Sequence, residues 1–168
     1  YTAGPAIAAR SITVSTVGLV PRIRQLGEDF GGQVQLALSL GAGTEATRRK
    51  VIPLTERYGL AALREAFEAY PRPKGVWSMI EYVLLAGVTD TVEELDGLVA
   101  FARGLPCVVN LIPWNPFEGA PFESPDIDAF IAARHHVDAQ GVRVRLRLPR
   151  GRNVAAACGQ LALTAPNA

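Results

Sequence analysis

Five short segments rich in β-branched or apolar residues alternate along this chain with longer segments of helical periodicity. Repeated strand and helix units of this kind form right-handed crossovers around a parallel sheet. The continuous apolar runs are typical of strands that are buried on both faces. The sequence therefore predicts an α/β fold, and the expected strands are 11–17, 34–40, 77–85, 107–112 and 142–148.

Helices are expected between these strands. Thr91 and Glu94 have the spacing of a capping box, which predicts a helix start at this point. Ser124 is expected to cap the last helix, with Pro125 at its first position. The residues expected to face inward from that last helix are Ile127, Phe130, Ile131 and Val137.

The composition indicates which broad class of protein this chain belongs to. The 168 residues are 49% hydrophobic, which is enough for the core of one domain spanning 1–168. The net charge of +1 favours no particular partner. Two cysteines exclude a disulfide framework, and no apolar run approaches the roughly 18 residues that cross a bilayer. We therefore expect a soluble cytoplasmic protein.

Small polar residues follow several of the predicted strands. Functional groups of parallel sheets gather at the carboxyl ends of the strands. This rule selects Ser15 with Thr16, Ser39 with Gly41, and the segment 110–115. Such a set fits a cofactor site, but serine and asparagine are also ordinary capping and turn residues.

The segment 150–161 combines basic residues, small residues and Cys158 beside a glycine. Small neighbours leave the sulfur open to a large substrate, although an unreactive, tightly packed cysteine fits the same pattern. Cys107 is best interpreted as a buried strand residue. His135 and His136 have no metal-ligating partner at a suitable spacing, so no metal site is predicted.

Alternating arginines mark the last expected strand. They would lie on one face, where they could bind RNA phosphates, or they could simply form the solvated face of an edge strand. Trp114 and Phe117 could stack on a base, although packing under the loop is the simpler interpretation. The arginines considered are Arg143, Arg145, Arg147, Arg150 and Arg152.

Several motifs closely resemble, in the same order, the later two-thirds of the RlmN and Cfr family of radical S-adenosylmethionine methyltransferases. Ile-Thr-Val-Ser-Thr-Val-Gly-Leu-Val-Pro and Leu-Ala-Leu-Ser-Leu come first, and Ile-Glu-Tyr-Val-Leu-Leu follows. The most specific motifs are Leu-Pro-Cys-Val-Val-Asn-Leu-Ile-Pro-Trp-Asn-Pro-Phe and Arg-Gly-Arg-Asn-Val-Ala-Ala-Ala-Cys-Gly-Gln-Leu. These motifs occupy 12–21, 36–40, 80–85, 105–117 and 150–161.

The resemblance implies a partial (β/α) barrel, of which this chain would supply roughly strands three to six plus a C-terminal arginine-rich strand. It also implies that Cys158 becomes S-methylated. Gly41 stands where histidine is common in the family. The residues implied to bind S-adenosylmethionine are Ser15, Ser39, Leu40, Gly41 and Asn115.

The family reaction explains why a cysteine is needed. One S-adenosylmethionine methylates the thiol, and a second is cleaved at a [4Fe-4S] cluster to give a 5′-deoxyadenosyl radical. This radical removes a hydrogen from the methyl group, and the carbon then adds to an adenine of 23S rRNA. The resemblance favours C2 of the adenine as the target and leaves open whether transfer RNA is also used.

Three family elements are absent: the Cys-x-x-x-Cys-x-x-Cys cluster loop, the Gly-Glu-Pro segment and the resolving cysteine. All precede this region in the family, and the chain begins with Tyr1, so we expect an inactive fragment of a monomeric enzyme, with an exposed strand edge near Ser11. A non-catalytic RNA- or protein-binding module is the alternative. An unrelated doubly wound enzyme would require the motifs to match by coincidence.

Overall fold

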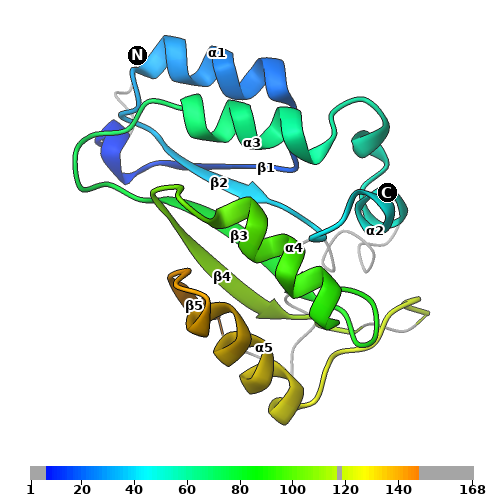
Figure 1. Ribbon diagram of the computed structural model, residues 1–168. Coiled ribbons are helices and arrows are strands. Elements are labelled where there is room, and N and C mark those ends of the chain that lie inside the picture. The colour runs from blue at the N-terminus through cyan, green and yellow to red at the C-terminus, as the bar shows by residue number, and fades with distance from the viewer. Residues whose placement is uncertain (1–6, 117–118, 148–168) are drawn as a thin grey trace, which may run out of the picture.

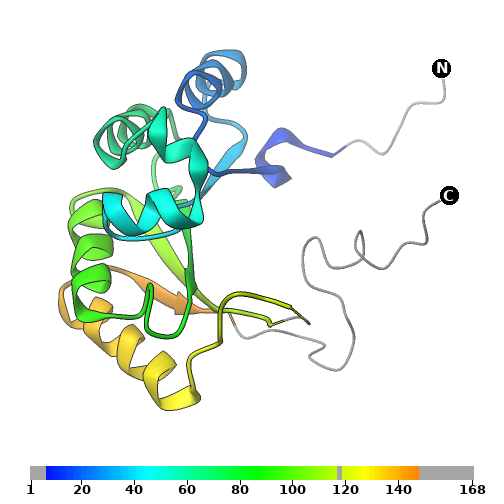
Figure 2. The same ribbon diagram turned by 90° about the vertical axis from the view of Figure 1, so that its right-hand side faces the viewer.

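A computed structural model describes residues 7–116 and 119–147, which form one parallel sheet with helices on one face (Figures 1 and 2). The sheet order equals the chain order, and every neighbouring pair is parallel. The predicted α/β fold is confirmed. The strands are β1 (Thr13–Thr16), β2 (Gln35–Ser39), β3 (Ser78–Leu84), β4 (Cys107–Pro113) and β5 (Val144–Leu146).

The helices connect consecutive strands, as the alternation of periods predicts. Gly31, with a φ of +54°, closes the first helix, and the Thr44 side chain caps the second by accepting from Thr47 N. Two short 3-10 helices accompany them, η1 (Ala9–Ser11) and η2 (Pro53–Glu56). The α-helices are α1 (Val20–Phe30), α2 (Glu45–Val51), α3 (Leu60–Ala69), α4 (Val92–Ala102) and α5 (Ile127–Ala139).

The face of the sheet that the helices cover is apolar. Register places Leu38 of β2 beside Ile80 of β3, and Ile80 beside Val109 of β4. These side chains are fully buried and belong to one cluster with residues of the covering helices, such as Phe67 and Phe130. Their burial stabilises the sheet by roughly 1.5–3 kcal/mol for each large apolar side chain.

Alternate residues of each strand point to the opposite face of the sheet. Residues on β3 and β4 alternate between buried and half-buried along the whole strand. Within the described residues no α-helix covers this second face, which Figure 2 shows on the side away from the five α-helices. The sheet is therefore a scaffold with one packed face and one open face.

The start of α5 differs from the prediction. Asp126, not Ser124, is the N-cap, because its Oδ1 accepts from Ala129 N at 2.7 Å. The helix consequently begins two residues later than expected, and Pro125 lies outside it. A carboxylate placed at the first free N–H groups of a helix satisfies them and also interacts favourably with the helix dipole.

The inward face of α5 is also narrower than predicted. Phe130 and Val137 are buried as expected, together with Ala133. The prediction for Ile127 and Ile131 was wrong, since these side chains are 59% and 41% exposed. A helix turns about 100° per residue, so Ile131 lies well outside the stripe that begins at Phe130.

Arg48 on α2 connects the carboxyl ends of the first two strands. Its side chain is fully buried. Nε donates to the carbonyl oxygen of Leu40 at 2.8 Å, and Nη2 donates to that of Val17 at 2.7 Å. Nη1 donates to Thr55 Oγ1 at 2.8 Å and to the carbonyl oxygen of Tyr58 at 3.2 Å. One guanidinium therefore links β1, β2 and the connection between α2 and α3.

Burial lowers the pKa of Arg48, and the charge of nearby Glu45 opposes that shift. An arginine has so high a pKa that it stays charged at neutral pH. The buried charge is accommodated because four acceptors surround it.

Replacing Arg48 with methionine is expected to lower the free energy of unfolding of the full-length protein by about 3 kcal/mol or more. Each buried carbonyl that loses its donor costs about 1–3 kcal/mol. Urea denaturation followed by circular dichroism measures the change. Arg49→Met is the matched control, because Arg49 is 57% exposed and lies 3.8 Å from Glu56. Equal losses in both variants would contradict the role assigned to Arg48.

Candidate cofactor site

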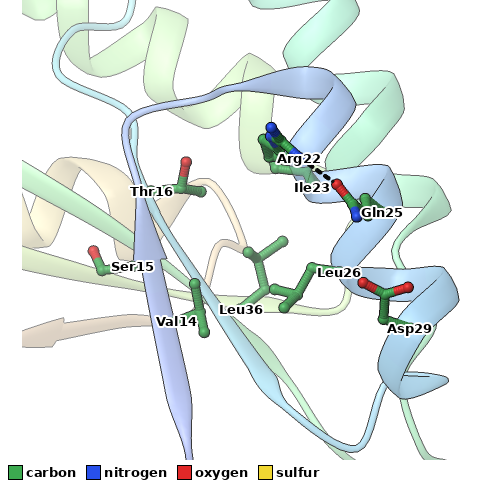
Figure 3. Close-up of a pocket in the computed structure, with 9 residues that line it drawn as sticks. All are labelled: Val14, Ser15, Thr16, Arg22, Ile23, Gln25, Leu26, Asp29 and Leu36. Atoms are coloured by element: carbon green, nitrogen blue, oxygen red, sulfur yellow. Dashed lines mark hydrogen bonds between the residues drawn. The ribbon is translucent and has the colours of Figure 1, made fainter.

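Ser15 and Ser39 lie on the open face of the sheet, near the carboxyl ends of β1 and β2. Ser15 pairs with Ala37 in register, and Ser39 lies two residues further along β2, so both serines have the same orientation. Figure 3 shows Ser15 on the side of β1 opposite Val14. The structure therefore brings these two predicted residues to one surface.

Leu40 contributes differently. Its side chain is fully buried, its backbone N–H donates to the carbonyl oxygen of Glu81 at 3.0 Å, and its own carbonyl oxygen accepts from Arg48. These contacts fix the end of β2. The role of Leu40 in cofactor binding stays a prediction, and its evident contribution is to hold Ser39 in place.

Gly41 has a backbone conformation that favours glycine. Its φ is +83°, and a Cβ atom would lie 2.4 Å from Ile52 Cδ1. Any side chain here would strain the backbone and displace the isoleucine. A glycine at position 41 is therefore consistent with the packing of Ile52.

Asn115 follows β4 and lines a pocket at the surface. A pocket of about 410 Å³ lies between the segment Pro113–Pro116 and the start of α5, where Asp126 and Phe130 line it. Trp114 packs edge-on against Phe122 at 6.1 Å between ring centroids, which agrees with packing under the loop. Asn115 thus lies at the carboxyl end of the sheet, as the sequence predicts.

A row of polar residues crosses the open face. Register places Ser39 beside Glu81, Glu81 beside Asn110, and Asn110 beside Arg145. Asn110 Nδ2 donates to Glu81 Oε1 at 2.9 Å. Sequence reasoning missed Glu81, although a carboxylate inside the apolar run of β3 was the available signal.

Arg145 of β5 and the flanking Arg143 and Arg147 extend this row to the edge of the sheet. Arg143, Arg145 and Arg147 are exposed, whereas the residues between them are half-buried. Arg143 lies over the Trp77 ring, 4.0 Å from its centroid, and Arg147 Nη1 is 3.9 Å from Glu81 Oε2. Both interpretations of the arginines remain consistent with this geometry. Arg150, Arg152 and Cys158 lie outside the described residues.

Glu94 anchors the loop that follows β2. Its Oε2 accepts from Gly43 N at 2.7 Å and Thr44 N at 3.1 Å, and its Oε1 accepts from Thr44 Oγ1 at 2.6 Å. The capping box is therefore half formed: Thr91 Oγ1 accepts from Glu94 N at 3.4 Å, but the Glu94 side chain bonds to the loop.

The loop and α4 are in close backbone contact at this anchor. A Cβ atom on Gly97 would lie 2.3 Å from the carbonyl oxygen of Gly43, and one on Gly43 would lie 1.9 Å from that of Glu94. Only glycine at both positions permits this approach. The loop between β2 and α2, which carries Gly41, is consequently held against α4.

Another pocket, of about 300 Å³, lies between β1 and α1 (Figure 3). Its apolar lining residues are Val14, Ile23, Leu26 and Leu36, and its polar ones are Ser15, Thr16, Arg22, Gln25 and Asp29. Ser15 and Thr16, which the strand-end rule selects together, line it, whereas Ser39, Leu40, Gly41 and Asn115 do not. β1 is the edge strand of the described sheet, as expected. This pocket of mixed polarity thus lies at the sheet edge and is not where the predicted site residues come together.

Cys107 lies in the core, and the two histidines lie on α5. Cys107 is buried, and burial raises the pKa of its thiol to about 11, so the thiol stays protonated at neutral pH. His136 Nε2 lies 2.7 Å from Asp96 Oδ1 and links α5 to α4, while His135 is exposed. No three potential metal ligands cluster in the described part of the chain. None of its helices is long and apolar enough to span a bilayer.

Comparison with curated proteins finds extensive similarity to one group. The chain is 43% identical over 159 residues, or 95% of its length, to the dual-specificity RNA methyltransferase RlmN of Anaeromyxobacter sp. strain Fw109-5. It is 42% identical over 157 residues to the RlmN of Sorangium cellulosum. The chain spans about two fifths of the length of these relatives. No protein-family model matches it.

Solved structures agree with the observed fold. A radical SAM methyltransferase from Sphaerobacter thermophilus superposes with a TM-score of 0.86 at 40% identity, covering 94% of this chain and 46% of that one. A domain of pyruvate-formate lyase-activating enzyme from Bacteroides vulgatus shares the fold, with a TM-score of 0.62 at 15% identity and 80% of each chain covered. The radical SAM type of fold expected from the sequence is confirmed.

Glu94→Gln is expected to lower the free energy of unfolding of the full-length protein by about 1.5–3 kcal/mol, because hydrogen bonds to a charged acceptor are replaced by weaker neutral ones. Urea denaturation measures the change. Glu93→Gln, on the exposed side of the same helix turn, is the control and should stay within about 0.5 kcal/mol of the parent. A Glu94→Gln variant as stable as the control would show that the loop does not depend on this carboxylate.

Proposed function

We propose that this chain, whose resemblance to the RlmN RNA methyltransferases is confirmed over almost its whole length, forms the later part of the catalytic domain of a radical S-adenosylmethionine enzyme that methylates RNA. Residues 1–168 would act as one domain of a cytoplasmic protein, since ribosomal RNA is found in that compartment. The observation that carries the proposal is the polar row on the open face of a sheet that otherwise matches a radical SAM methyltransferase.

The open face suits S-adenosylmethionine chemically. The cofactor is a cation that also carries ammonium and hydroxyl donors, and the face presents serine, asparagine and carboxylate acceptors. Glu81 Oε2 is buried and accepts no hydrogen bond from the described residues, so an acceptor is available. The residues that would hold the cofactor are Ser15, Ser39, Leu40, Gly41 and Asn115.

The [4Fe-4S] cluster would be held by another part of the full-length protein. Three closely spaced thiolates are the usual ligand set, and this chain has two cysteines, Cys107 and Cys158. Cys107 is buried with a protonated thiol, which makes it unsuitable as a ligand. When the cluster and S-adenosylmethionine are bound together, they supply a carbon-centred radical. This chain alone is expected to be inactive.

Cys158 would carry the transferred carbon. Its thiol loses a proton, and the sulfur takes a methyl group from S-adenosylmethionine, which leaves as S-adenosylhomocysteine. For this carbon to be added to adenine, the radical would remove a hydrogen atom from it, and the adduct formed on the adenine ring would lose one electron and the ring proton. The carbon–sulfur bond would then break as the sulfur of Cys158 forms a disulfide with a second cysteine from another part of the full-length protein. C2 of adenine is not nucleophilic, so direct methyl transfer from S-adenosylmethionine would not succeed there. A carrier residue is therefore a chemical requirement of the proposed reaction.

The proposed substrate is 23S rRNA, with transfer RNA as a second candidate because the relatives are named dual-specificity RNA methyltransferases. Arg145 of β5 and the flanking Arg143 and Arg147, together with Arg150 and Arg152, would bind phosphates beside the site. We propose that the full-length enzyme works as a monomer. A non-catalytic RNA-binding module remains the alternative that the experiments below distinguish.

The full-length protein, produced with iron–sulfur assembly factors, is expected to carry a methyl group on Cys158. Peptide mass spectrometry detects the added 14 Da, which follows from replacing a thiol hydrogen by a methyl group. Cys158→Ala should abolish RNA methylation, whereas Cys107→Ala should retain it. An unmodified Cys158 in protein that contains the cluster and S-adenosylmethionine would favour the binding module.

Arg145→Gln is expected to weaken RNA binding and to reduce the slope of log K against log salt concentration by about 1, the effect of one lost phosphate contact. Filter binding at several salt concentrations measures the slope. Arg24→Gln is the control, because Arg24 is a 54% exposed arginine on α1 that pairs with Glu65. An unchanged slope in the Arg145 variant would identify the arginines as a solvated face only.

A further inference from the structure

Glu81 is a carboxylate in the middle of the open face. It lies on β3 between Ser39 of β2 and Asn110 of β4, and its side chain is 14% exposed. Oε1 accepts from Asn110 Nδ2 at 2.9 Å, a contact that fixes the carboxylate plane. Oε2 is buried, and no hydrogen bond reaches it from the described residues.

A buried carboxylate oxygen without a donor is costly, at about 1–3 kcal/mol or more for a charged group. The nearest cation of the described residues is Arg147, whose Nη1 lies 3.9 Å from Oε2. That separation exceeds hydrogen-bond length, and the Arg147 side chain is 69% exposed, so solvent screens the pair. Within residues 7–116 and 119–147, the groups around Glu81 therefore leave one acceptor without a hydrogen bond.

The position of Glu81 indicates which kind of ligand could donate a hydrogen bond to its Oε2. Neighbouring strands lie about 4.8 Å apart, so a ligand that touches Ser39 is within reach of the Glu81 carboxylate. An anionic acceptor favours a cationic ligand with N–H or O–H donors. S-adenosylmethionine has a sulfonium charge, an ammonium group and two ribose hydroxyls. Phosphate groups of RNA would instead be repelled.

We propose that Glu81 is a binding residue for S-adenosylmethionine, with Oε2 accepting a hydrogen bond from the ammonium group or a ribose hydroxyl of the cofactor. Asn110 then acts as a positioning residue that holds the carboxylate in its orientation. The proposal rests on the proposed function, and it adds a residue that the resemblance does not name.

The test compares full-length Glu81→Gln with the parent by isothermal titration of S-adenosylmethionine. Glutamine keeps the shape of the side chain and removes the charge. The affinity for the cofactor is expected to fall about 10-fold or more, as for a lost hydrogen bond to a charged group. Glu65→Gln, a change of the same kind at a 74% exposed position on α3, should leave the affinity unchanged.

Thermal unfolding of the ligand-free protein distinguishes a cofactor contact from a structural one. Removing the charge of a carboxylate whose Oε2 accepts no hydrogen bond from the described residues should leave the ligand-free Tm unchanged or higher, while the increase in Tm on adding S-adenosylmethionine should shrink. Glu81→Asp, which keeps the charge but shortens the side chain, should also bind the cofactor more weakly. It serves as the second variant in case glutamine disturbs folding.

Two outcomes would overturn the proposal, and they differ from each other. If Glu81→Gln binds S-adenosylmethionine within twofold of the parent and has a lower ligand-free Tm, the donor to Oε2 belongs to the protein. In that case the proposed function stands and only the role of Glu81 fails. If the parent protein does not bind S-adenosylmethionine at all, both proposals fail together.

Discussion

The hydrogen bonds of the buried Arg48 guanidinium determine where the carboxyl ends of β1 and β2 lie. Strand pairing ends at Thr16 and Ser39, and beyond those residues the backbone carbonyls of Val17 and Leu40 have no strand partner to bond. Arg48 donates to both, from a helix that comes later in the chain. Ser15 and Ser39 therefore keep their spacing because one side chain holds the ends of both strands.

The loop between β2 and α2 is held on its other side by a second buried charged residue, Glu94. The Glu94 carboxylate accepts three hydrogen bonds from Gly43 and Thr44, and the paired glycines Gly43 and Gly97 let the loop approach α4. A cation on one side and an anion on the other thus fix the segment between β2 and α2. Charge-assisted hydrogen bonds hold geometry more tightly than apolar packing does. A segment intended to present backbone and hydroxyl groups to a ligand benefits from that rigidity.

Much of the fold could be predicted from the sequence because strand and helix periods depend on neighbouring residues. The β-branched run before Gly18 and the apolar run before Gly41 each became a strand. The start of α5 was missed because Ser124 and Asp126 are both good capping residues, and only the backbone path decides which one reaches the free N–H groups.

The site was harder to predict, because its members are brought together by register and not by sequence spacing. Ser39, Glu81 and Asn110 lie 42 and 29 positions apart along the chain, yet they are adjacent in the sheet. Ser15, Ser39 and Asn115 were named through family motifs, whereas the anchoring roles of Arg48 and Glu94 depend on tertiary partners that no local pattern reveals. Glu81 differs from these two anchors, because it is a charged residue inside an apolar segment, whereas Arg48 and Glu94 lie in polar, charged segments.

The two faces of the sheet show why such charges are retained. Where a buried charge makes several hydrogen bonds, as the four of Arg48, replacing it removes structure. Where one oxygen of a buried carboxylate has no donor, as at Glu81, stability alone gives no reason to keep it, since an amide of the same shape would cost less to bury. Proteins commonly accept such a loss of stability at binding sites. The Arg48 guanidinium thus has hydrogen-bond partners, whereas Oε2 of Glu81 has no donor among the described residues. This difference is the physical argument for placing ligand binding on the open face, at the centre of its polar row.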